Sequence, residues 1–100
     1  MSVFAQRLRA ARLRTGLSQE RLGIEAGLDP MSASARMNRY ELGKRVPDAP
    51  LVERIAAVLD VPVAYLHLVN DDEAELLLKF HRLNKKQRSK VVAFIDEVSD

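Results

Sequence analysis

One hundred residues are enough for one compact domain with a single hydrophobic core, without room for a separate catalytic or effector domain. The chain has no cysteine and only two histidines, His67 and His81, so we expect neither a metal ion nor another cofactor. Residues 1–49 carry nine basic and five acidic side chains, a net charge of +4, whereas residues 50–100 carry seven and nine, a net charge of −2. This asymmetry suits a chain that binds a polyanion with one end.

The apolar segments are too short for a membrane protein. The longest, residues 61–69, is interrupted by Pro62 and His67, and the N-terminus lacks the apolar run of a signal peptide. We therefore expect a cytoplasmic protein.

Helical periodicity continues along the whole chain, which predicts an all-α fold. A first helix is expected over about residues 3–14, with Gly16 as a left-handed C-terminal cap. Ser18 offers an N-cap to a short second helix, about residues 19–26.

The middle of the chain predicts three more helices. Asp29 and Pro30 form a cap and first-turn pair that opens a third helix, which continues to about Leu42. Asp48 can cap a fourth helix over about residues 50–59, and a brief fifth helix follows over about residues 62–66.

The C-terminal part predicts a helical hairpin. Its helices are expected over about residues 72–82 and 85–98, with Asn84 as the N-cap of the second. The expected organisation is a five-helix bundle over residues 1–69 and a two-helix hairpin over residues 70–100.

Residues 16–48 contain the most specific pattern in the sequence. The pieces LSQERL, AGL and MNRYELGKRVP, followed by LVERIAAVLDVPVAYL, together resemble the helix-turn-helix of phage-repressor (Cro and cI) and xenobiotic-response-element regulators. The resemblance extends over roughly residues 4–68. It implies a bundle that binds double-stranded DNA as a homodimer and regulates transcription, most simply as a repressor, by laying its third helix in the major groove.

The resemblance assigns roles to individual residues. Gln19 matches a position that contacts phosphate or a base edge, while Ser34, Ala35 and Arg39 match base-contacting positions. Lys44 and Arg45 match contacts to the DNA backbone. Arg12 and Glu41 match a structural charge pair between the first and third helices.

The chemistry of the third helix agrees with that role. Its predicted exposed face adds Arg36 and Asn38 to Ser34, Ala35 and Arg39. Arginine can make a bidentate contact to guanine and asparagine to adenine, and the alanine methyl suits the methyl group of thymine.

The sequence departs from the family pattern at three places. Fifteen residues separate Gly27 from Gly43, about four more than is usual, which leaves the start of the third helix open. Gly23 replaces the usual alanine, at a cost of up to about 1 kcal/mol in helix propensity. Asp60 replaces a glycine after the fourth helix, and aspartate can adopt left-handed geometry.

The C-terminal hairpin is expected to be the main dimerisation element, because its apolar stripes are wider than one helical neighbour requires. The residues assigned to that interface are Leu76, Leu77, Phe80, Val91, Phe94, Ile95 and Val98.

Other functions stay open at this level. The same bundle could serve as a protein-interaction adaptor that has lost DNA binding, or as the antitoxin of a toxin–antitoxin pair. An enzyme is not expected, because the sequence has no catalytic serine–histidine–carboxylate pattern and no glycine-rich phosphate loop.

Overall fold

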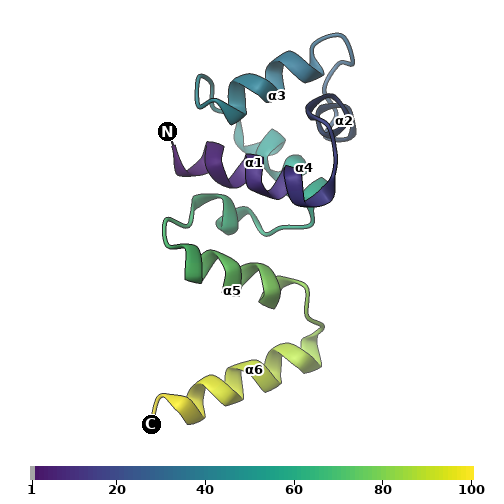
Figure 1. The fold of residues 1–100 in the computed structure, drawn as a ribbon. Helices are drawn as coiled ribbons and strands as arrows, with labels where there is room; N and C mark the ends of the chain where they lie inside the picture. Colours follow the sequence, from purple (N-terminus) through teal and green to yellow (C-terminus); the bar gives the residue numbers. More distant parts are fainter. Residues whose placement is uncertain (1) are drawn as a thin grey trace.

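The computed structural model describes residues 2–100, and the elements in this part of the chain are helical. Figure 1 shows the helix-turn-helix end of the molecule and, at the opposite end, the two C-terminal helices. The elements are α1 (Val3–Thr15), α2 (Gln19–Glu25), α3 (Ala33–Glu41), α4 (Ala49–Leu59), the 3-10 helix η1 (Val63–His67), α5 (Asp71–His81) and α6 (Lys85–Val98).

The predicted helix ends are confirmed at most positions by their caps. Gly16 adopts the left-handed conformation after α1, with φ of 78°. The side chains of Ser18 and Asp48 accept hydrogen bonds from the backbone N–H groups of Arg21 and Leu51, at 2.9 Å each. Asn84 begins α6 in a capping box with Gln87, in which each side chain accepts from the other residue's backbone N–H.

The predicted start of the third helix is wrong by three residues. The carboxylate of Asp29 accepts a hydrogen bond from the backbone N–H of Met31 at 2.9 Å, which forms a local turn rather than a helix cap. Residues 30–32 continue as turn, and α3 begins at Ala33. The extra residues of this segment therefore lengthen the connection between α2 and α3, and α3 itself has nine residues.

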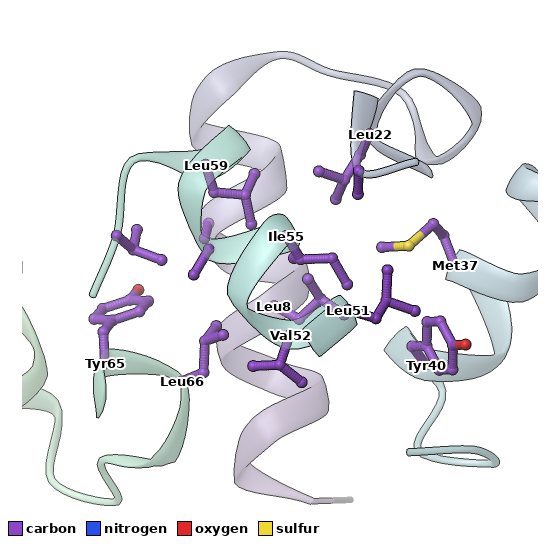
Figure 2. Close-up of a cluster of buried hydrophobic side chains, with 14 of the residues drawn as sticks. Leu8, Leu22, Met37, Tyr40, Leu51, Val52, Ile55, Leu59, Tyr65 and Leu66 are labelled. Atoms are coloured by element: carbon purple, nitrogen blue, oxygen red, sulfur yellow. The ribbon is translucent and has the colours of Figure 1, made fainter. Parts of the chain in front are cut away.

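The hydrophobic core lies around α4. Figure 2 shows Ile55 and Leu51 of α4 beside Leu8 of α1, with Met37 of α3 next to them. Leu8, Met37 and Ile55 are fully buried. α3 is therefore attached to the bundle by its inner face, and its outer face stays free.

α5 belongs to the same core. Ala74 and Leu78 of α5 are buried in the cluster formed by the first five helical elements. Two ion pairs link α1 to α5: Arg7 Nη2 lies 2.9 Å from Asp71 Oδ1, and Arg14 Nη2 lies 2.9 Å from Glu75 Oε2. α5 therefore packs against the bundle formed by the first five helical elements.

α6 lies outside this core. None of its residues is buried, and it diverges from α5 after a short turn, so that the two helices form an open V (Figure 1). Within residues 2–100, none of the helices combines the length and the apolar character that crossing a membrane would require.

Candidate functional site

α2 and α3 approach each other very closely at Gly23. A Cβ atom added there would lie 2.8 Å from the Cβ of Ala33 and 3.1 Å from its backbone oxygen. Gly23 and Ala33 are both buried. The glycine therefore allows α2 to brace α3 directly.

The inner end of α3 is fixed by an ion pair. Arg12 Nε lies 2.6 Å from Glu41 Oε2, and Arg12 Nη2 lies 3.0 Å from Glu41 Oε1. Glu41 is only 3% exposed, and Arg12 also donates to the backbone oxygen of Leu17. The pKa of Arg12 is raised, mainly by its hydrogen bond to Glu41. The structure thus brings together the two residues assigned to a structural pair, in bidentate geometry.

Gln19 connects this pair to the outer face of α3. Its side-chain amide nitrogen, Nε2, donates to Glu41 Oε1 and to Asn38 Oδ1, at 3.2 Å each. Both amide hydrogens are therefore used within the protein, whereas the sequence assigned Gln19 to phosphate or a base edge. In the second of these hydrogen bonds the Oδ1 atom of Asn38 faces Gln19. Sequence reasoning missed this link, because its only signal is that Asn38 and Glu41 lie three residues apart on one helix.

The outer face of α3 carries four of the five side chains predicted for it. Ser34, Ala35, Asn38 and Arg39 are exposed. Arg36 is instead half-buried, because its Nη2 donates to the hydroxyl of Tyr40 at 2.9 Å and its guanidinium lies over the Tyr40 ring. The prediction of Arg36 as a freely exposed side chain is therefore wrong, and its guanidinium lies toward the C-terminal half of α3.

A basic cleft follows α3. We call it the arginine cleft, and its lining residues are Arg36, Arg39, Tyr40, Arg45, Val46, Pro47 and Asp48. Gly43, with φ of 73°, turns the chain, and the backbone N–H of Lys44 donates to the backbone oxygen of Arg39 at 3.0 Å. Lys44 and Arg45 are both exposed at the start of this loop. Cations from the helix and from the loop therefore meet beside the outer face of α3.

The residues assigned to dimerisation lie away from this site, on α5 and α6. Leu76, Phe94, Ile95 and Val98 are exposed, whereas Leu77, Phe80 and Val91 are half-buried. Leu77 also packs against the bundle core.

Residues 3–68, which contain α1 to α4 and η1, match the family model of the helix-turn-helix domain. A solved structure described as the crystal structure of the transcriptional regulator BswR is similar, with 43% sequence identity and a TM-score of 0.88, over 97% of this chain and 94% of that chain. No match was found among curated proteins. The chain belongs to the helix-turn-helix domain family.

Proposed function

We propose that this protein is a transcriptional regulator that binds double-stranded DNA in a sequence-specific manner, as a homodimer, with α3 in the major groove. One observation carries the proposal: the inner face of α3 is fixed by Glu41, while Asn38 and Arg39 on the outer face are exposed. A helix that is braced on one side and free on the other suits insertion into the groove.

Base reading is proposed for the outer face. Arg39 can make a bidentate contact to guanine, and Ser34 and Ala35 lie at the N-terminal end of α3, where repressors of this type approach base edges. Asn38 offers amide donors, since its Oδ1 already accepts a bond from Gln19. Gln19 then acts by positioning Asn38.

Phosphate contacts are proposed for the residues around the arginine cleft. Lys44 and Arg45 are exposed in the loop, and Arg36, whose guanidinium lies over the Tyr40 ring, lines the same cleft as Arg45. Such contacts fix the register of a protein on DNA without reading sequence. The net charge of +4 on residues 1–49 favours the same polyanion.

The dimer is proposed to place two α3 helices in successive major grooves, about 34 Å apart. An inverted repeat is then the expected binding site. Occupying such a site in a promoter would hinder transcription, which makes repression the simplest mode of action.

Selection of bound sequences from a random duplex library, followed by footprinting, tests this function. We expect an enriched inverted repeat whose half-sites are one helical turn apart. The control is the Lys44→Glu/Arg45→Glu variant, which reverses the charge of two side chains proposed to contact phosphate. This variant should enrich no sequence. A wild-type chain that enriches no sequence at low salt would contradict the proposal and favour a protein-interaction adaptor.

A further inference from the structure

α6 is a well-formed helix with an uncovered apolar face. Its capping box fixes the start of the helix at Asn84, yet none of the residues of α6 is buried. Phe94 is 63% exposed and Val98 is 69% exposed, and Ile95 is also exposed beside them. Such a row of large apolar side chains on one helix is a surface that another molecule can cover.

The uncovered face continues into an apolar groove between the two arms of the V. Leu76 and Phe80 of α5 line one side, and Val91 and Ile95 of α6 line the other. The elbow of the V is held by Arg88, which donates to the backbone oxygens of Phe80 and His81 at 3.1 and 2.7 Å and lies over the Phe80 ring. This fixed elbow keeps the groove accessible.

The charges on α6 are separated along its length. The first two turns carry the exposed cations Lys85, Lys86 and Lys90, whereas the segment from Asp96 to Asp100 carries three carboxylates and no cation. Such a helix is complementary to a second copy of itself in the opposite direction, because each basic start then lies beside an acidic end.

We propose that α6 packs antiparallel against α6 of a second copy of this chain, with the apolar face of each helix entering the groove of the other copy. The proposal rests on the homodimer of the proposed function and names its interface. A two-fold axis relates the two copies. Each contact between a residue of the first copy and a residue of the second is therefore repeated with the two copies exchanged.

The size and place of the interface fit this assignment. An α6 helix of 14 residues is only about 21 Å long, so two such helices alone fall short of the roughly 800 Å² per partner of a standard interface. Leu76 and Phe80 of α5, which line the groove, supply additional surface. α6 also lies at the end of the molecule opposite α3 (Figure 1), which leaves both α3 helices free for DNA.

Sedimentation equilibrium of full-length variants, without DNA, tests whether this surface is the interface. We expect a dimeric wild type at micromolar concentration and a Phe94→Asp variant that is monomeric with unchanged helical content. The matched control is Val69→Asp, which changes a still more exposed apolar residue outside α6 and should stay dimeric. A monomeric wild type, or a Phe94→Asp variant that dimerises as the wild type does, would overturn the proposal.

Two charge variants test the antiparallel direction. Lys85→Glu/Lys86→Glu reverses two of the three exposed cations at the start of α6, and Asp96→Lys/Glu97→Lys reverses both carboxylates of the helix. Each alone should weaken the dimer by at least about tenfold, because attraction becomes repulsion at both ends, and an equimolar mixture should restore it. High salt should weaken the wild-type dimer modestly, whereas a parallel pair would become tighter.

These measurements are independent of DNA. Lys44→Glu/Arg45→Glu carries the same charge change as Lys85→Glu/Lys86→Glu. It should dimerise as the wild type does but should no longer bind DNA. Charge variants of α6 that dimerise as tightly as the wild type would overturn the antiparallel interface even if sequence selection succeeds. A dimer that behaves as expected but selects no sequence would contradict only the DNA-binding function.

Discussion

Gly23 in α2 faces Ala33 in α3 so closely that a Cβ atom at position 23 would lie 2.8 Å from the Cβ of Ala33. Ala33 cannot move aside easily, because the contacting atoms are its backbone oxygen and its Cβ, which is attached directly to the backbone. Gly23→Ala should therefore destabilise the protein. Overpacking should cost about 1–3 kcal/mol, and the higher helix propensity of alanine should offset up to about 1 kcal/mol of that cost. Urea unfolding measures the change.

The double variant Gly23→Ala/Ala33→Gly is the control for this contact. Removing the methyl group of Ala33 should relieve part of the clash, so the two substitutions should show a favourable coupling free energy. A Gly23→Ala protein that is more stable than the wild type would show that α2 and α3 can separate at no cost.

The Arg12–Glu41 pair should contribute far more to stability than an exposed pair. Glu41 is buried and the side chain of Arg12 is only 12% exposed. Arg12→Ala would leave the buried carboxylate of Glu41 without its partner and should lower the free energy of unfolding by about 3 kcal/mol or more. A double-mutant cycle with Glu41→Ala, followed by urea unfolding, isolates the coupling. The exposed pair Arg21–Glu25, with Nε 3.2 Å from Oε2, serves as the comparison and should couple by less than about 0.5 kcal/mol. Equal coupling in the two pairs would disprove the structural role.

The Arg14–Glu75 pair should make stability depend on pH in the acid range. The hydrogen bond from Arg14 lowers the pKa of Glu75 below its ordinary value of 4.5. The resulting stabilisation is complete above that ordinary value and is lost as the pH falls through the lowered pKa of the folded state. Glu75→Gln should therefore narrow the difference in unfolding free energy between neutral and acid pH.

Arg14→Gln supplies the control, because it removes the partner and leaves the carboxyl group in place. It should flatten the pH dependence as Glu75→Gln does, and the double variant should add nothing further. Additive effects would mean that the two side chains do not interact in solution.

Lys44 should act on DNA without regard to sequence. Lys44→Ala should weaken binding to the selected site and to random duplex by a similar factor, because a phosphate contact is present in both. The slope of log Kd against log salt should fall by about one, as one fewer phosphate is neutralised. A loss confined to the selected site would instead make Lys44 a base contact.

Short-range signals in the sequence were enough to predict most of the fold. Gly16, Ser18 and Asn84 mark helix ends because their conformational freedom or side-chain oxygens act within a few residues. Asp29 shows the limit of such signals. Its carboxylate can cap a helix or close a local turn with the same chemistry, and the structure has the turn.

The candidate site depended more on contacts between distant residues. Periodicity was sufficient to assign Arg39 to the outer face of α3, since that assignment needs only the helix repeat. It could not predict that Arg36 bends onto Tyr40, or that Gln19 donates to Asn38, because these contacts depend on side-chain conformation and on how α2 meets α3.

The affinity of Arg39→Ala for every single-base variant of the selected site is the most direct test that α3 reads sequence. Arg39 is exposed on the outer face of α3, where its guanidinium can reach a guanine edge. We expect a loss of about 1–3 kcal/mol on the selected site, together with a loss of discrimination at one base position in each half-site. Equal weakening on the selected site, its variants and random duplex would make Arg39 a phosphate contact and would contradict base reading by this residue.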